Sequence, residues 1–363
     1  MQIDFHYYAA YAASVIAGFS HEEALRIAYS DQFTDCCTRR FLSKIGGPKN
    51  AATTQTQIEL ADARTDLIGL QDITRIWSSF HFLPYDLYAK VKAGIRYRNK
   101  YRLICMPNGS LVKDTVENAK GKGPEAAGVA MHVLCDTWAH SGFAGTPSLV
   151  INNTNDYFYE ILPDPSGIKE RKIKLTSSLG AVDDPETGAY NGSLYQPSEN
   201  SIMNLGHGRA GHLPDYSYAQ YKYLPAWMGY EERYKDNQHD YFYAFCQMTE
   251  ALKYLHGDIP EFDVEKYAFK DVEPYKDEIM AIISKRQILA SEDWKRFGEK
   301  LSGKEIPDFD ATVYDEEYIN ASKDRKSETV HGKFITAALS QKSLVSYRVY
   351  ESKNLLAGIV KAK

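Results

Sequence analysis

The chain has 363 residues, of which 44% are hydrophobic and 25% are charged, and its formal net charge is −5. This length suits one large domain or two, and the composition excludes collagen-like, coiled-coil and disordered proteins. The mild acidity argues against a protein that holds duplex nucleic acid by charge. A bound metal ion can still provide the positive charge that a phosphate substrate requires.

The cysteines and the N-terminal sequence bear on the compartment. The five cysteines follow no metal-binding or disulfide spacing, so we expect reduced thiols and a cytoplasmic protein. Residues 1–6 lack the basic start of a signal peptide, and secretion would need a route without one. The apolar stretch over residues 9–19 is too short to cross a bilayer, and we expect no membrane span.

The first part of the chain has the apolar spacing of helices. Ser20 and Glu23 have the spacing of a capping box, which predicts a helix start. Pro84 and Pro124 suit the first turns of two further helices. The helices expected here are 7–19, 20–35, 57–69, 85–93 and 124–142.

Residues from 145 to about 200 are rich in Asn, Asp, Pro, Gly and Ser, and strand-like pieces occur at 157–162 and 168–175. This pattern predicts an irregular, partly β insertion with a hairpin. The helices expected after it are 216–223, 239–255, 275–300 and 334–361. We therefore expect a mainly α fold, with a metal-binding helical bundle in residues 1–258 and a C-terminal helical extension in residues 259–363.

The most informative motif lies on the helix predicted after Pro124. His132, Asp136 and His140 occupy positions i, i+4 and i+8, which project from one face of a helix. Imidazole nitrogens suit zinc or iron, and a carboxylate such as Asp136 can bridge two ions. The alternative is a polar seam between helices, in which each of these groups would need its own hydrogen-bond partner.

Further candidate ligands lie in four other places. Asp31 and Asp35 are four residues apart on a predicted helix, where like charges are unfavourable unless a cation lies between them. His6 follows Asp4 near the start of the chain, and His81 lies alone between two phenylalanines.

The glycine-rich segment 206–215 contains His207, His212 and Asp215, and its Arg209 is a candidate for binding an anionic substrate. The adjacent His239 and Asp240 lie among charged residues, which favours a solvated helix start over a metal site.

The order of these residues resembles that of the zinc-dependent phospholipase C and P1-type nuclease superfamily, whose members are all-helical and cleave phosphodiesters with up to three zinc ions. The ligands that this resemblance implies are His6, Asp31 or Asp35, His81, His132, Asp136 as the bridging carboxylate, His140, and His207 or His212 with Asp215. Members of that superfamily also use the amino group of a processed N-terminal tryptophan. The opening residues 3–8 and the block 136–140 also look like a bacterial and fungal family of unknown function.

The resemblance implies a metal-dependent hydrolase that acts on a small-molecule or lipid phosphoester. It implies two or three zinc ions, with iron or manganese as alternatives, and a metal-bound hydroxide as nucleophile. Asp136 would hold the ions, and Arg209 would neutralise developing charge. Two alternatives stay open: an HD-type phosphohydrolase or di-iron oxygenase that uses the dyad of His239 and Asp240, and a non-catalytic protein that binds a ligand or partner in a tyrosine-rich cleft.

Overall fold

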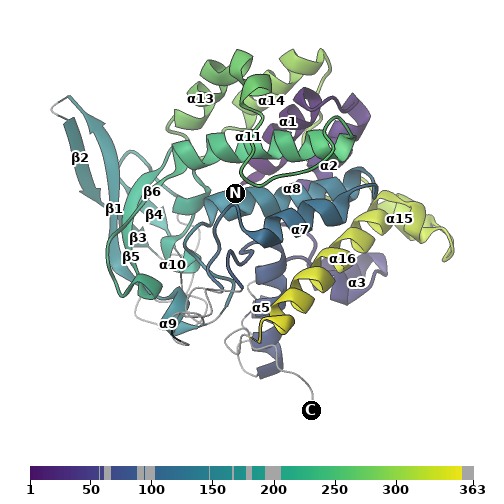
Figure 1. Ribbon diagram of the computed structural model, residues 1–363, viewed down its shortest axis with the longest axis horizontal. Helices are drawn as coiled ribbons and strands as arrows, with labels where there is room; N and C mark the ends of the chain where they lie inside the picture. Colours follow the sequence, from purple (N-terminus) through teal and green to yellow (C-terminus); the bar gives the residue numbers. More distant parts are fainter. Residues whose placement is uncertain are drawn as a thin grey trace.

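The computed structural model describes residues 1–56, 58–60, 67–87, 94, 103–146, 148–165, 167–176, 182–192 and 206–353. It is mainly helical, with a small sheet on one side of the helices (Figure 1), which confirms the expected fold class. No helix within these ranges has the length and apolarity that crossing a membrane requires. All five cysteines have free thiols.

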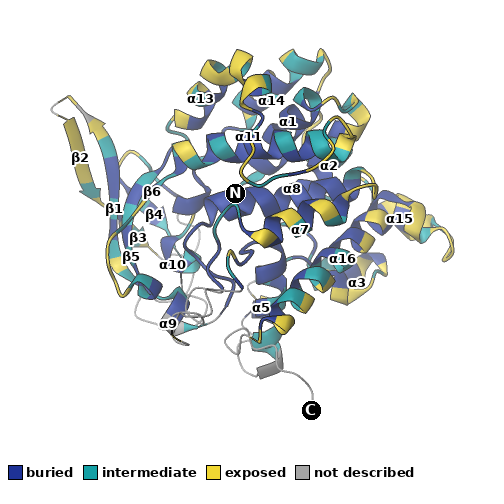
Figure 2. Cartoon of the chain, viewed as in Figure 1, coloured by how far each residue is buried: buried dark blue, intermediate teal, exposed yellow. Residues whose placement is uncertain are grey.

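Helix α8 (Pro124–Ala139) forms the centre of the molecule. Its sequence is apolar on most sides, which is typical of a helix that is covered all round, and every residue from Glu125 to Ala139 is buried (Figure 2). The helices that pack against it include α2 (His21–Phe33), α7 (Ser110–Ala119), α11 (Asn237–His256) and α16 (Val330–Glu351). The side chains of α8 are thereby shielded from solvent.

The chain begins with a buried helix that changes type along its length. The π-helix η1 (Asp4–Ala9) continues directly into α1 (Ala10–Ile16), so the helix expected over 7–19 starts earlier than predicted. The predicted capping box is confirmed, because the Ser20 side chain accepts from the backbone N–H of Glu23 and the Glu23 side chain accepts from the backbone of Ser20.

The sheet contains four antiparallel strands in the order β2-β1-β5-β6. Strands β1 (Thr154–Asp164) and β2 (Gly167–Lys172) form the hairpin that the sequence predicts. Strands β5 (Gln220–Pro225) and β6 (Arg233–Asp236) complete it, and β3 (Lys174–Thr176) pairs in parallel with β4 (Ala189–Asn191).

The helix predicted over 216–223 is wrong. Residues along β5 alternate between half-buried and buried, and Tyr221 and Tyr223 both enter the smaller hydrophobic cluster beneath the sheet. This period of two is that of a strand. The predicted helix over 239–255 is confirmed as α11.

Two other predicted helices need correction. The range 275–300 contains two helices, α13 (Lys276–Ser284) and α14 (Ser291–Ser302), and the range 334–361 belongs to α16, which begins at Val330. Its residues after 353 lie outside the described ones.

Pro84 forms a bridge with Cys105 and starts no helix, and residues 85–87 are not helical; residues 88–93 lie outside the description. Of the range 57–69, residues 58–60 and 67–69 are helical and the others are not described.

The remaining elements are short or peripheral. They are α3 (Arg39–Ile45), η2 (Lys49–Ala51), α5 (Leu67–Phe80), α9 (Leu149–Asn152), α10 (His207–Ala210), η4 (Leu213–Asp215), η5 (Ala226–Met228), α12 (Phe269–Val272), η6 (Glu273–Tyr275), α15 (Asp315–Asn320) and η7 (Lys326–Glu328). The larger hydrophobic cluster contains residues from Met1 to Val349, so helices before and after residue 258 share one core.

Candidate metal centre

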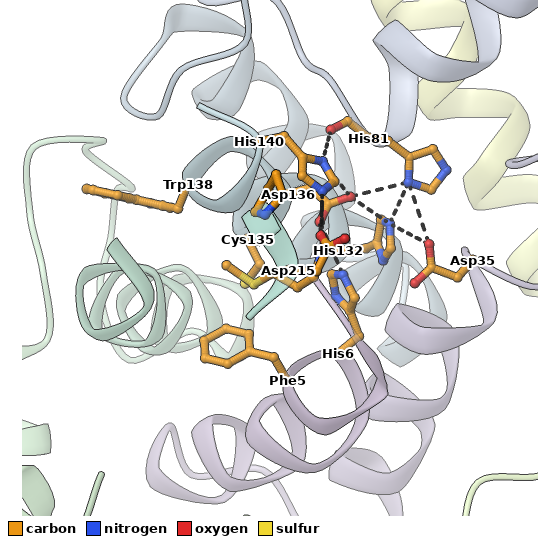
Figure 3. Close-up of polar contacts among 12 residues, drawn as sticks. Phe5, His6, Asp35, His81, His132, Cys135, Asp136, Trp138, His140 and Asp215 are labelled. Carbon is orange, nitrogen blue, oxygen red and sulfur yellow. Dashed lines mark hydrogen bonds and ion pairs between the residues drawn. The ribbon is translucent and has the colours of Figure 1, made fainter. Parts of the chain in front are cut away.

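Histidine and aspartate side chains from five parts of the chain meet beside α8 (Figure 3). Three sets of them, within the described ranges, could each hold a metal ion, since their ligand atoms lie within 4.8 Å of one another. The sets are His6, Asp35 and His132; His81, His132 and Asp136; and His140, His207 and Asp215.

Close packing of α2 against α8 brings the first of these side chains together. A Cβ atom on Gly128 would lie 2.3 Å from the carbonyl oxygen of Ile27 and 2.8 Å from the backbone nitrogen of Asp31. Because glycine has no side chain, Gly128 allows the backbones of α2 and α8 to pack in direct contact. His132 follows Gly128 by one helical turn, so the same contact places it beside Asp31.

Three atoms of the second set form a nearly equilateral triangle. His81 Nδ1 lies 3.2 Å from His132 Nε2 and 3.2 Å from Asp136 Oδ2, and the third edge, from His132 Nε2 to Asp136 Oδ2, is 3.3 Å. Two atoms that bind one tetrahedral zinc ion at about 2.0–2.1 Å lie roughly 3.3–3.4 Å apart. Asp35 Oδ1 is 3.6 Å from His81 Nδ1 and 3.8 Å from His132 Nε2.

Backbone carbonyls set the tautomers of two histidines. His81 Nε2 donates to the carbonyl oxygen of Thr53 at 3.0 Å, so its Nδ1 keeps the lone pair that faces Asp136. His140 Nδ1 donates to the carbonyl oxygen of His81 at 2.7 Å, which leaves Nε2 free, 3.0 Å from Asp215 Oδ1. Such contacts orient metal ligands in known metal sites.

The Met1 amino group is buried between two carboxylates of the centre. It donates to Asp136 Oδ1 at 2.8 Å, lies 3.1 Å from Asp215 Oδ1, and is 3.5 Å from His140 Nε2. Burial opposes its charge, but Asp136 and Asp215 outweigh that effect and raise the pKa of the amino group to about 11. The ammonium therefore balances part of the buried negative charge.

The other titratable groups divide into charged and neutral ones. Burial disfavours the charge on His132, but the carboxylates of Asp136 and Asp35 raise its pKa to about 10. Burial lowers the pKa of His140 to about 4, against the pull of Asp136. Burial also opposes ionisation of Asp136 and Asp215, yet neighbouring histidines and the amino group hold the pKa of each carboxyl well below its usual range.

Solvent reaches the centre at two edges. The Asp35 side chain is 31% exposed and that of His207 is 19% exposed, whereas the side chains of His6, His132 and Asp136 are almost fully buried. Phe82 stacks on His140 with ring centres 4.8 Å apart, and its ring is nearly perpendicular to that of His207, with centres 5.7 Å apart. Asp35 and His207 are thus the most exposed members of the three sets.

Three predicted site residues, Asp31, His212 and Arg209, lie outside the three sets. His212 Nδ1 lies 3.2 Å from Asp183 Oδ2, so His207, and not His212, joins Asp215. Arg209 contacts Asp156 at 3.1 Å. Asp4 is also no member, because its carboxylate accepts from the backbone N–H groups of Phe5 and Ala290.

The dyad of His239 and Asp240 has the surroundings that the sequence suggested. The His239 side chain is 53% exposed and lies 3.2 Å from Asp240, which also accepts from Lys235. The backbone N–H of His239 donates to Asp236, which caps the start of α11. This dyad therefore lies in the first turn of a helix and outside the three sets.

Sequence reasoning missed Thr53, which acts through its backbone carbonyl. Every residue type offers that group, so no motif could have revealed it. It also missed the contact of Phe82 with two of the ligands, because a phenylalanine beside His81 is equally typical of a hydrophobic core.

One family model matches residues 1–350 and is described as a family of unknown function, DUF6765. No curated protein and no solved structure matches the chain.

Proposed function

We propose that this chain, which belongs to the DUF6765 family, is a metal-dependent hydrolase that acts on phosphoesters. The triangle of His81 Nδ1, His132 Nε2 and Asp136 Oδ2 is the observation that carries the proposal. Its edges match the spacing of ligands around one tetrahedral ion, and mixed imidazole and carboxylate ligands favour zinc, with iron or manganese as alternatives.

The buried charges of the centre also support a cation there. Asp31, Asp136 and Asp215 are all buried, and a buried carboxylate is costly unless a positive charge or hydrogen bonds compensate it. The order of ligands along the chain, which resembles that of zinc-dependent phospholipases C and P1-type nucleases, points to the same chemistry.

Each residue of the centre has a proposed role in binding or orientation. Ions held there would supply Lewis-acid chemistry, which polarises a phosphoryl oxygen and activates water. Asp136 belongs to the second set and also contacts His6 of the first, since its Oδ2 faces His81 and His132 while its Oδ1 faces His6. The exposed edges at Asp35 and His207 admit the phosphoester, and Phe82 covers the imidazole of His140.

The test compares ligand variants with a matched control. The purified chain should contain two or three equivalents of zinc by elemental analysis and hydrolyse a chromogenic diester such as bis(4-nitrophenyl) phosphate. His132→Ala and Asp136→Ala should lose metal and reduce activity by several orders of magnitude. His239→Ala removes an imidazole that also contacts an aspartate but lies outside the three sets, and it should change neither metal content nor activity.

The contrary outcomes identify the competing functions. Iron with oxygen-dependent turnover would favour a di-iron oxygenase, and metal loss in His239→Ala would favour an HD-type site. A folded protein that takes up no metal would be a ligand- or partner-binding protein and would overturn the proposal.

A further inference from the structure

We infer that Asp31 is a positioning residue that holds the imidazoles of His6 and His132 by their Nδ1 atoms, whereas Asp35 is the metal-ligating carboxylate of α2 and its C-terminal turn. The inference rests on the proposed function, because it concerns how the same centre is built. It separates two aspartates that lie four residues apart and that sequence alone cannot distinguish.

The two ring nitrogens of each histidine face different carboxylates. Asp31 Oδ1 lies 2.6 Å from His6 Nδ1 and 3.3 Å from His132 Nδ1. The Nε2 atoms of the same rings lie 3.2 Å and 3.3 Å from oxygens of Asp136. Asp31 is therefore behind both rings, and Asp136 is in front of them.

Distances distinguish a ligand from an orienting group. Two atoms bound to one tetrahedral zinc ion lie roughly 3.3 Å apart, so 2.6 Å between Asp31 Oδ1 and His6 Nδ1 is too short for both to be ligands of one ion. It is the distance of a close ion pair, just below the range of about 2.7–2.9 Å that is usual for charge-assisted N–H···O contacts. Asp35 Oδ1 instead faces His132 Nε2 and His81 Nδ1, at 3.8 Å and 3.6 Å, on the side where Asp136 lies.

Burial and stacking make Asp31 dependent on these two rings. Asp31 is fully buried, and its ion pairs within the described ranges are those with His6 and His132. The two rings stack with centres 4.0 Å apart and planes 23° apart, so one carboxylate can serve both. A carboxylate behind a ligating imidazole fixes its tautomer and raises its basicity, which directs both Nε2 lone pairs into the centre.

The experiment compares Asp31→Asn with Asp35→Asn in the full chain. Each variant keeps the shape of the side chain and removes one charge from the same part of the fold. Metal-free protein is titrated with Co²⁺, with stoichiometry and affinity measured by competition with a chromophoric chelator, and the visible spectrum reports the ligand set.

Asp31→Asn should keep the wild-type number of Co²⁺ ions and the wild-type spectrum, with affinity lowered about 10- to 100-fold. Asp35→Asn should lose one equivalent or change the spectrum, because it removes a ligand. The reverse pattern, with an ion lost in Asp31→Asn and none in Asp35→Asn, would overturn the inference.

A measurement on the unsubstituted chain covers the case in which a variant fails to fold. Nitrogen-15 NMR of the zinc-loaded protein should show His6 and His132 protonated at Nδ1 and metal-bound at Nε2. Zinc bound at either Nδ1 would overturn the inference. Both results are independent of the reaction: a chain that binds metal in this way without cleaving phosphoesters contradicts the proposed function alone, and one that binds no metal contradicts both.

Discussion

At the scale of single residues, protons occupy positions that a metal ion would need. His132 has a pKa of about 10 and the Met1 amino group one of about 11, so both carry a proton at neutral pH. His140, with a pKa of about 4, is neutral there. A metal ion that binds His132 must displace its proton, because a ligating imidazole offers a lone pair.

We therefore predict that metal binding releases protons and that apparent affinity rises from pH 6 to about pH 10. Calorimetric titrations with zinc in buffers of different ionisation enthalpy measure the number of protons released. The number should fall in His132→Ala. A binding enthalpy that is independent of the buffer would contradict the prediction.

The raised pKa of His132 also makes the stability of the metal-free protein depend on pH. The pKa of His132 is raised from 6.5 to about 10, so its stabilising contribution is fully present below pH 6.5 and is lost as the pH rises through 10. The melting temperature of metal-free protein should fall over this range, more steeply than that of His132→Ala. A parallel fall in the two proteins would assign the effect to other groups.

Much of the candidate centre can be predicted from residue types and their spacing along the chain. His132, Asp136 and His140 were predicted to share one helix face, and the structure brings all three into the candidate sets with His6, His81, His207 and Asp215. The choices between Asp31 and Asp35, and between His207 and His212, depend on which way a side chain turns. That direction is set by packing against other elements, which spacing along the chain does not encode.

At the scale of elements, the contact between α2 and α8 determines the geometry of the centre. We predict that Gly128→Ala lowers the free energy of unfolding by about 1–3 kcal/mol, because the added Cβ meets backbone atoms that cannot rotate away. It should also reduce metal content, since it moves α2, and the Asp35 that follows it, away from His132. Chemical denaturation and elemental analysis measure the two effects.

Gly298→Ala in α14 is the matched control. Its Cβ would lie 2.7 Å from Ile306 Cδ1 and 3.0 Å from Tyr11 Cδ1, so it also crowds a packed helix, but against side chains away from the centre. This variant should lose stability and keep its metal. Equal metal loss in both variants would mean that general destabilisation, and not the α2–α8 distance, is the cause.

Local signals predicted elements well where they were strong. The capping box at Ser20 and the proline at the start of α8 are short-range features, and both helices begin where these residues indicate. The prediction of a helix at β5 is wrong because Tyr221 and Tyr223 alternate with half-buried residues. This is the period of two that a strand has. Its pairing with β1 and β6 comes from distant parts of the chain.

At the scale of the whole molecule, residues on both sides of position 258 form one core. Asp4 accepts from the backbone N–H of Ala290 at 2.9 Å, at the start of α14, and Gln341 of α16 donates to Ser79 and Thr115. The sequence suggested a boundary here because the C-terminal helices contain no obvious chemistry. A helix without candidate ligands can still be needed for packing. Here α14 covers η1 and α16 covers α8, and η1 and α8 carry candidate ligands.

We predict that a fragment of residues 1–258 does not fold cooperatively, because it exposes the faces of η1 and α8 that α14 and α16 cover. Near-ultraviolet circular dichroism and thermal unfolding measure this, with the full chain as the reference. A fragment with a sharp transition and bound metal would show that residues 1–258 are an independent domain.

The position of η1 has a consequence for the order of events during synthesis. Side chains of η1 contact residues that are made much later: 130 positions separate His6 from Asp136, and 286 separate Asp4 from Ala290. At translation rates of about 5–20 residues per second, Ala290 is made roughly 15–60 s after Asp4. The buried aromatic residues of η1 therefore wait for α14 before they are covered, and the three ligand sets cannot be complete before Asp215 has been made.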